Sequence, residues 1–222
     1  MYLKLAVLLA ILSFHGQLTM ASDPDPIQDF CVPNPKFDSL RPARFGTLQC
    51  KNVTEVTTDD FVFSGMKVAG NFSETGVAII PVNPSLFPGL NTLGMSFVRA
   101  DLKAGSVNPP HFHPRATEIA YVLRGSVYSG FVDSTNRVFA RVLEEGEVMV
   151  YPRGLLHFQM NVGKKPATIF GSFNSQNPGT QKIPSAIFGS GIDEELLEKA
   201  FGLSPKQIEV MRRRFDPKST VM

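Results

Sequence analysis

The stretch EIAYVLRGSVYSGFV, residues 118–132, decides the fold class. Two runs rich in Val, Tyr and Phe lie on either side of Gly125, an arrangement typical of two strands joined by a turn. Similar short apolar runs are separated by Gly, Pro, Asn and Asp, for example GVAIIPV (76–82), LGMSFVRADL (93–102), EVMVYP (147–152), HFQMNV (157–162) and ATIFGSF (167–173). We therefore predict an all-β domain, a sandwich or a barrel, whose core spans about residues 60–185.

Helices are expected only near the C-terminus, in a segment of about residues 186–216. Residues 193–201 carry acids in a first turn and precede Gly202, and a second helix is predicted from Ser204, which Pro follows at the first helical position. An apolar stripe runs along that second helix at Ile208, Met211 and Phe215. Two or three short helices must bury such stripes on the barrel or on a neighbouring subunit.

The N-terminus has the layout of a secretory signal peptide. A lysine precedes the apolar run LAVLLAILSF (5–14), and Ala21 precedes Ser22. That run is too short to cross a hydrocarbon core of about 30 Å. We therefore predict a signal peptide at residues 1–21 and a mature chain, residues 22–222, that is one secreted, soluble domain without a membrane span.

The charge balance excludes a nucleic-acid partner, because the formal net charge of the 222-residue chain is only +2. The one basic cluster, Arg212 to Arg214, lies near the end of a predicted helix, where cations complement the helix dipole. We interpret it as a solvated helix end.

The chain holds two cysteines, Cys31 and Cys50, within the Pro-rich segment 22–59. In a secreted chain this even count predicts one disulfide, which closes a loop of about 20 residues and contributes roughly 3 kcal/mol. The segment would then be an extension wrapped on the barrel. Two sequons, at Asn52 and Asn71, predict N-linked glycans in the same compartment.

The histidines concentrate in two short motifs. After loss of the signal peptide, His111, His113 and His157 remain, and Glu118 follows His113 closely. Side chains at i and i+2 of a strand share a face, so the first two imidazoles point the same way. Three imidazoles and one carboxylate form a metal-binding set that suits manganese or iron, while zinc, copper and nickel remain open by ligand type.

These residues carry a resemblance to a known family. Two patterns resemble the two cupin motifs, Gly105-x5-His111-x-His113-x4-Glu118-x6-Gly125 and Gly146-x5-Pro152-x-Gly154-x2-His157-x3-Asn161. The closer resemblance is to the germins and germin-like proteins of plants, and it is carried by SDPDPIQDFCV (22–32), NPPHFHPRATEI (108–119), PRGLLHFQMNVG (152–163) and SFNSQNPG (172–179).

The resemblance implies a jelly-roll β-barrel that binds manganese through His111, His113, Glu118 and His157. It also implies a glycoprotein of the plant apoplast or cell wall. Such proteins are usually hexamers built as trimers of dimers, in which the C-terminal helices clasp neighbouring subunits. Asn71 lies where germins commonly carry a glycan.

The resemblance also implies two enzymatic activities. Germins proper oxidise oxalate, and Asn108 and Gln159 match two of the residues thought to hold that substrate, whereas Val98 stands where the family has a second asparagine. Losing one hydrogen-bonding group from a buried site costs about 1–3 kcal/mol, which counts against oxalate oxidation. Superoxide dismutation needs only an accessible redox metal and a small anion, and we rank it first.

Non-catalytic readings come from other classes. A metal-holding cell-wall or receptor-like protein is a real competitor, and some relatives are described as sugar-nucleotide hydrolases or auxin-binding proteins. Seed storage vicilins share the fold but have generally lost the metal ligands, so the four ligands retained here count against storage.

Overall fold

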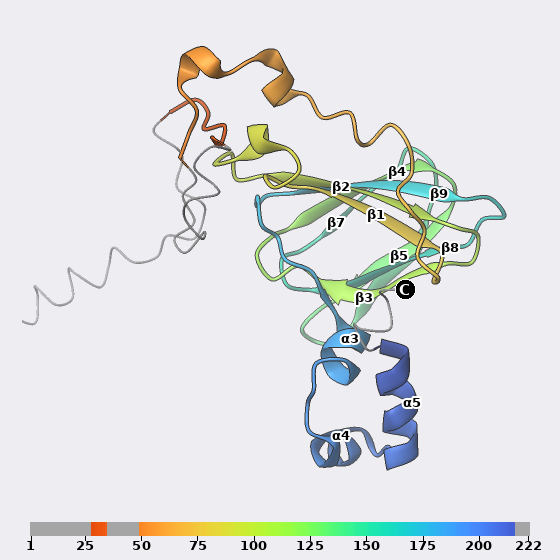
Figure 1. Ribbon diagram of the computed structural model, residues 1–222. Helices are drawn as coiled ribbons and strands as arrows, with labels where there is room; N and C mark the ends of the chain where they lie inside the picture. Colours follow the sequence, from red (N-terminus) through yellow and green to blue (C-terminus); the bar gives the residue numbers. More distant parts are fainter. Residues whose placement is uncertain (1–27, 35–48, 216–222) are drawn as a thin grey trace, which may run out of the picture.

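The computed structural model describes residues 28–34 and 49–215 (Figure 1). The predicted signal peptide lies outside these ranges. Two five-stranded sheets make up most of the described chain. One sheet has the order β1 (Val77–Val82), β2 (Ser96–Leu102), β9 (Ala167–Phe173), β4 (Glu118–Arg124), β7 (Val148–Tyr151). The other has the order β10 (Gln181–Lys182), β3 (Val107–Phe112), β8 (Leu156–Asn161), β5 (Val127–Val132), β6 (Val138–Leu143).

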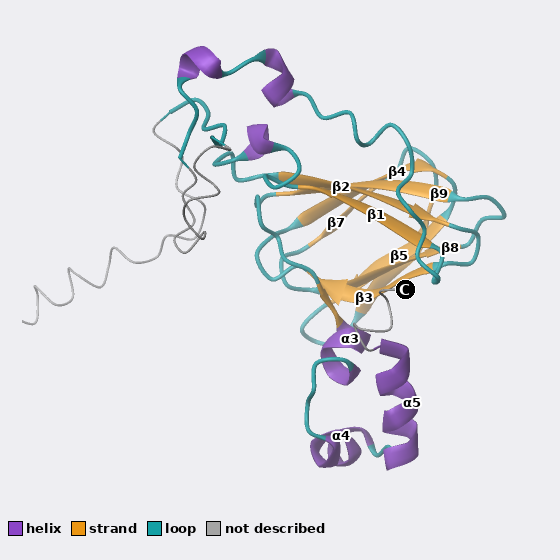
Figure 2. Ribbon diagram, in the orientation of Figure 1, coloured by secondary structure: helices purple, strands orange, loops and turns teal. Residues whose placement is uncertain are grey.

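Every strand pair in the two sheets is antiparallel. β9 lies between β2 and β4, and β8 lies between β3 and β5, so strands distant in the sequence become neighbours. Figure 2 shows the strands stacked as two layers with the helices outside them. The prediction of an all-β jelly-roll barrel is confirmed.

Alternating burial along the strands explains why these residues form a two-layer fold. In β4, Glu118, Ala120 and Val122 are buried, whereas Ile119 and Tyr121 are exposed. This period of two places one face of the sheet against the opposite layer. The apolar core between the layers comprises Val77, Ala100, Leu102, Ala120, Val122, Val127, Leu143, Tyr151, Ala167 and Ile169.

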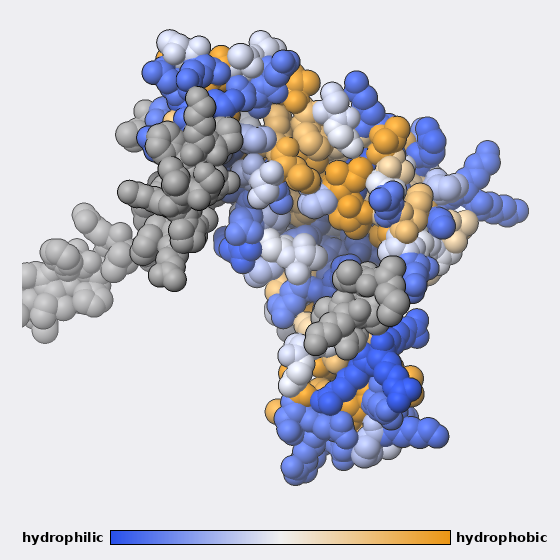
Figure 3. Space-filling model, in the orientation of Figure 1, coloured by the Kyte–Doolittle hydropathy of each residue, from blue (hydrophilic) through white to orange (hydrophobic). Residues whose placement is uncertain are grey.

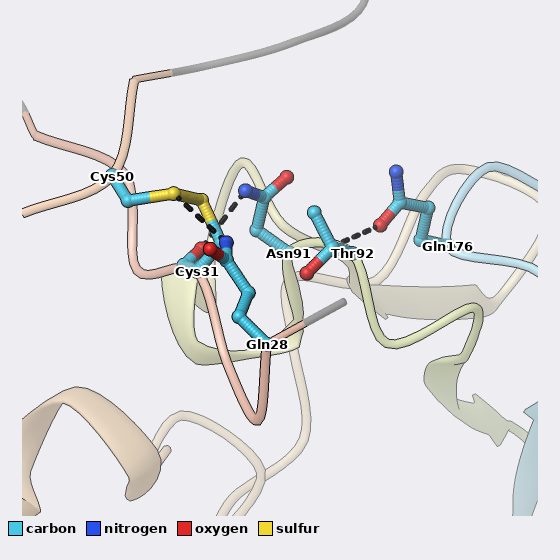
Figure 4. The surroundings of a disulfide bond; sticks show 6 residues. All are labelled: Gln28, Cys31, Cys50, Asn91, Thr92 and Gln176. Carbon is cyan, nitrogen blue, oxygen red and sulfur yellow. Dashed lines mark hydrogen bonds between the residues drawn. A yellow bond between two sulfur atoms is a disulfide. The ribbon is translucent and has the colours of Figure 1, made fainter. Parts of the chain in front are cut away.

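The N-terminal segment is fastened to one end of the barrel. Cys31 and Cys50 form the predicted disulfide. Figure 4 shows how Asn91 reaches this bond: its Nδ2 donates to the Cys31 carbonyl over 2.9 Å. Val32, next to the disulfide, is 1 % exposed. Three short 3-10 helices follow, η1 (Val53–Glu55), η2 (Thr58–Phe61) and η3 (Pro88–Leu90).

The C-terminal helices are α3 (Ile183–Phe188), α4 (Glu194–Phe201) and α5 (Pro205–Phe215). The two helices expected around residues 193–201 and from Ser204 are confirmed, and Gly202 ends α4 with a φ of 65°. The stripes bury against one another: Leu197 and Ile208 are almost fully buried. Figure 1 shows the three helices beside the barrel, below β3. No helix within residues 28–34 and 49–215 is long and apolar enough to cross a membrane.

Candidate metal centre

A break in strand register places the first two histidines. β3 pairs regularly with β8 at Asn108, and the register then shifts before His111, which lies opposite His157. The two prolines between Asn108 and His111 explain the shift, because proline has no N–H for a ladder and is tolerated at bulges. The break turns both His111 and His113 into the barrel, where they are 4 % and 5 % exposed.

The two sheets contribute different ligands. His157 lies in β8 of the same sheet as β3, whereas Glu118 opens β4 of the opposite sheet. One donor atom from each of the four residues lies within 4.8 Å of the others. All four side chains are buried. The residues predicted to bind a metal therefore form one compact cluster between the layers.

Backbone carbonyls fix the orientation of all three imidazoles. Nδ1 of His111 lies 2.8 Å from the Pro109 carbonyl. Nδ1 of His157 lies 2.8 Å from the Leu155 carbonyl, and Nδ1 of His113 meets the Gly179 carbonyl. A carbonyl only accepts, so each Nδ1 carries the proton of the neutral ring. Each Nε2 then directs a lone pair toward the centre of the cluster, as a metal ligand does.

Two atoms of the cluster show that the donor set fits a cation. Glu118 Oε2 lies 3.1 Å from His113 Nε2 and 3.2 Å from His157 Nε2. Because the rings are protonated at Nδ1, these contacts bring lone pairs together. Glu118 Oε2 and His157 Nε2 are buried without a hydrogen-bonding partner. Buried polar groups without partners are costly, and a cation held between them satisfies both.

The surroundings keep the ligands in the protonation states that bind metals. Burial, together with the neighbouring His157, lowers the pKa of His111 to about 3. At neutral pH His111 is therefore a neutral imidazole, which has no proton to lose from the ring nitrogen that faces the cluster when a cation binds.

A cavity of about 290 Å³ adjoins three of the ligands, His111, His113 and Glu118. Its apolar wall includes Ile79, Pro81, Phe97, Val98, Ile169 and Phe173. Its polar lining includes Asn83, Ser96, Asn108, Gln159, Thr180 and Lys182. Residues of both β1 and β10 line it, and each is an edge strand of its sheet.

The three predicted substrate contacts all line this cavity. Asn108 Nδ2 donates to Gln159 Oε1 over 2.7 Å, so the two amides form one polar patch. Val98 lies across the cavity, on β2. A Cβ added to Gly171 would come within 2.5 Å of Glu118 Oε1 and 2.6 Å of Val98 Cγ1. Because glycine has no side chain, position 171 leaves room for the Glu118 carboxylate and the Val98 side chain.

Sequence reasoning missed two residues near the metal centre. Tyr151, 1 % exposed, stacks on the His157 ring with 4.4 Å between ring centroids and 7° between planes. Lys182 of β10 lies opposite His111 in register and lines the cavity. The signal for Tyr151 was its polar hydroxyl within the apolar run EVMVYP. Lys182 had no such signal, because an exposed lysine is ordinary.

Comparison with known proteins agrees with this geometry. The chain matches the cupin family over residues 64–209. It is 67 % identical over 210 residues to germin-like protein subfamily 3 member 2 of Arabidopsis thaliana, which covers 94 % of this chain and 92 % of the relative. It is 56 % identical over 220 residues to germin-like protein 2-4 of Oryza sativa subsp. japonica, covering 97 % and 93 %.

A solved structure of oxalate oxidase superimposes with a TM-score of 0.82 at 42 % sequence identity, covering 87 % of this chain and 98 % of that one. These relatives match the chain along nearly all of its length. The chain belongs to the cupin family and, within it, to the germin-like proteins.

Proposed function

We propose that the protein is a secreted, manganese-binding germin-like glycoprotein that dismutates superoxide. The observation that carries the proposal is the buried cluster of His111, His113, Glu118 and His157, which adjoins a cavity and in which Glu118 Oε2 and His157 Nε2 have no hydrogen-bonding partner. Three imidazoles and one carboxylate combine nitrogen ligands with a hard oxygen, a set that suits manganese. Manganese, when bound, supplies reversible one-electron chemistry.

The residues around the cluster prepare it for a small anion. The Glu118 carboxylate offsets one unit of cation charge, and the neutral imidazole of His111 adds none. Asn108 and Gln159 place amide groups in the cavity wall, and Lys182 adds a positive charge to its lining. Two superoxide anions and two protons yield dioxygen and hydrogen peroxide, so the site must admit an anion and protons in turn.

Oxalate oxidation is the second candidate, and the structural similarity to oxalate oxidase favours it. Asn108 and Gln159 lie together in the cavity, as that reaction would need. Val98, on the opposite wall, offers no hydrogen bond to a carboxylate. We therefore place oxalate oxidation below superoxide dismutation. A metal-holding or receptor-like role without catalysis is the reading that remains if neither activity is found.

Two exposed asparagines support the proposed extracellular, apoplastic location. Asn52 and Asn71 of the sequons are both exposed, so both side chains are open to solvent, as a glycosylated asparagine must be. The Asn52 side chain accepts hydrogen bonds from the backbone and hydroxyl of Thr54, the threonine of its own sequon. The Cys31–Cys50 disulfide fits the same oxidising compartment.

Two separate apolar surfaces support the proposed hexamer. On the outer face of the first sheet, Ile119 is paired with Val150 and Tyr121 with Val148, and all four are exposed. Figure 3 shows that apolar side chains also gather over this sheet on the side of β1 and β2. The helices form the second surface, with Leu196, Phe201 and Val210 exposed. A trimer of dimers needs two different interfaces, and large exposed apolar patches mark such interfaces.

Elemental analysis and a superoxide assay on the native protein test the proposal. We expect about one manganese per chain, and in His111→Ala a loss of activity of at least about 100-fold, because second-shell changes alone cost 10–100-fold. Circular dichroism shows whether the variant keeps its β structure. An oxalate assay on the same preparations separates the two enzymes.

Equal activity in the native protein and His111→Ala would remove the metal-site mechanism. A fully manganese-loaded protein with neither activity would leave the non-catalytic reading in place.

A further inference from the structure

One of the three imidazoles of the metal centre depends on a distant segment for its orientation. His111 and His157 each bond to the carbonyl of the residue two positions earlier in the chain. The partner of His113 is instead the Gly179 carbonyl, which lies 66 positions away in the sequence. Local backbone geometry therefore fixes two of the rings, whereas the third requires that Gly179 be held in place.

A second group lies near the same nitrogen of His113. Thr180 Oγ1 is 3.4 Å from Nδ1. A hydroxyl can donate as well as accept, so it does not fix the tautomer of an imidazole. The Gly179 carbonyl can only accept, and it keeps the proton of the neutral ring on Nδ1. Gly179 is therefore the partner that leaves the lone pair of His113 Nε2 to a metal.

Arg115 holds the loop 174–180, which joins β9 to β10 and contains Gly179. Its Nε donates to the Asn177 carbonyl over 2.6 Å, and its Nη2 donates to Asn177 Oδ1 over 2.8 Å. Its backbone N–H donates to the Pro178 carbonyl over 3.1 Å. Two of these bonds come from the planar guanidinium, whose rigid fork fixes an orientation that a point donor does not. Arg115 thus fastens both residues that precede Gly179.

The guanidinium also packs directly on Gly179. A Cβ added to Gly179 would come within 2.9 Å of Arg115 Nη2 and 3.1 Å of Pro114 Cγ. The φ of Gly179 is 67°, in the left-handed region that favours glycine. The lack of a side chain at position 179 therefore lets the arginine lie against the residue whose carbonyl contacts His113.

We propose that Arg115 is a positioning residue: it holds the loop 174–180 so that the Gly179 carbonyl stays on Nδ1 of His113, which then directs Nε2 to the cation. Arg115 is not itself a ligand, because a guanidinium has no acceptor and its donors are turned to the loop. This inference rests on the proposed metal site, but not on which reaction the site performs.

The charge of Arg115 provides a test, because positioning and electrostatics predict opposite effects. A positive charge near the centre repels a divalent cation, so its removal alone would strengthen manganese binding. Arg115→Met removes the charge together with the guanidinium bonds. We expect it to weaken manganese binding about five- to tenfold, the effect of about one net hydrogen bond. Competition with a chelator measures the dissociation constant.

Arg115→Lys keeps the charge but cannot reproduce the two-pronged contact with Asn177. We expect it to weaken manganese binding to a similar extent. Arg124→Met, at the exposed far end of β4, removes an arginine away from the loop and is the matched control. It should leave the dissociation constant of manganese unchanged.

Two further measurements report the position of the ring and of the loop. Electron paramagnetic resonance of bound manganese(II) depends on the arrangement of its ligands, and we expect its fine structure to change in Arg115→Met. Hydrogen exchange of the loop 174–180 in the metal-free variant should be faster than in the wild type, while the strands exchange at the wild-type rate.

A double-variant cycle tests whether Arg115 acts through the loop. Asn177→Ala removes one acceptor of the guanidinium. If the arginine acts through Asn177, the combination of Asn177→Ala with Arg115→Met should bind manganese less than about twofold more weakly than Arg115→Met alone.

Unchanged or tighter manganese binding in either variant of Arg115 would overturn the positioning role, and so would additive effects in the cycle or an unchanged resonance spectrum. A wild-type protein that binds no manganese would overturn both this inference and the proposed function. If the variants behave as expected but the wild type does not dismutate superoxide, the proposed enzyme is refuted and the role of Arg115 stands.

Discussion

The interior of the barrel has two parts built on the same strands, and burial has opposite effects on the free energy in these two parts. Glu118 and Val122 both face inward from β4, four residues apart, yet Val122 belongs to the apolar core and Glu118 to the metal centre. Tyr151 belongs to both, since it packs in the core and stacks on His157. The core gains free energy from burial, whereas the metal centre buries polar groups at a cost.

This difference teaches that fold and function are separable along a single strand. Most residues of the core support the barrel away from the cavity, which only Ala100 and Ile169 of the core also line. Residues of the metal centre stay unsatisfied until a cation arrives, as the buried Oε2 of Glu118 and Nε2 of His157 show. Changes in the first part should therefore alter stability, and changes in the second should alter binding.

The largest effect is expected in the apolar core. Leu102 is 0 % exposed, and Leu102→Ala removes its buried methyl groups and leaves a cavity. We expect the free energy of unfolding to fall by about 2–5 kcal/mol, with the manganese content of the folded fraction unchanged. Denaturant unfolding and elemental analysis measure the two quantities. A change in metal content without loss of stability would contradict the separation of the two parts.

In the metal centre, a substitution should raise the stability of the metal-free protein and abolish manganese binding, the reverse of the effects expected in the core. The same measurements check both effects. Glu118→Gln removes a buried charge and supplies an N–H to the lone pair of His157 or His113. We expect the metal-free protein to gain about 1–3 kcal/mol of stability while manganese binding is lost. Glu145→Gln, at an exposed position, is the control and should change neither. A destabilised metal-free variant would show that the carboxylate stabilises the fold.

Low pH should reduce the free energy of unfolding of the metal-free protein through His111 of the same cluster. Burial lowers the pKa of His111 from 6.5 to about 3, so between these values the unfolded chain binds a proton that the folded chain does not. Stability from this residue is full above pH 6.5 and is lost as the pH falls toward 3, by at most about 1.4 kcal/mol per pH unit.

Denaturant unfolding across this pH range measures the slope, and His111→Phe should reduce it. An unchanged slope in that variant would show that His111 is not the group that titrates.

A smaller effect is expected on the cavity wall. Val98→Asn adds a hydrogen-bonding group opposite Asn108. We expect oxalate to bind about fivefold more tightly, the effect of roughly 1 kcal/mol from one hydrogen bond, as measured by calorimetry on the manganese-loaded protein. Val107→Asn, at a half-exposed position outside the cavity lining, is the matched control. Unchanged oxalate binding in Val98→Asn would show that valine is not what disfavours this substrate.

The smallest effect is expected at Lys182, the only lysine or arginine among the described residues that line the cavity. Because the side chain is exposed, its attraction for an anion is screened by salt. Lys182→Gln should lower kcat/KM for superoxide about two- to threefold at low ionic strength, with the difference vanishing at high salt. Lys206→Gln, on α5, is the control. A salt-independent loss would indicate a role other than attraction.

The ligand cluster could be predicted from the sequence because its residue types, histidine and glutamate, and their spacing indicate metal binding. Histidines at i and i+2 share a face, and few side chains besides His and Glu bind metals in this way. The alternating apolar runs predicted the strands for a similar reason. The helix α3 was not predicted by itself, because the six residues IPSAIF form a short apolar run that fits a strand equally well.

Other features of the site depend on contacts between distant segments. The partners of Tyr151 are Ser129 on β5 and the His157 ring on β8, and nothing in the local sequence of β7 points to either. The position of Lys182 beside the cavity follows from the pairing of β10 with β3. Such pairings are set by the whole barrel, so residue type alone does not reveal them.

The backbone carbonyls behind the three imidazoles have a consequence for how such a protein can change over evolution. The groups that orient the rings belong to Pro109, Leu155 and Gly179, and they are main-chain atoms that every residue type supplies. No single substitution can delete them. Heritable variation in this centre is therefore directed to the cavity wall, where Val98, Asn108 and Gln159 can be exchanged without disturbing the ligands. The metal site can stay constant while the substrate changes.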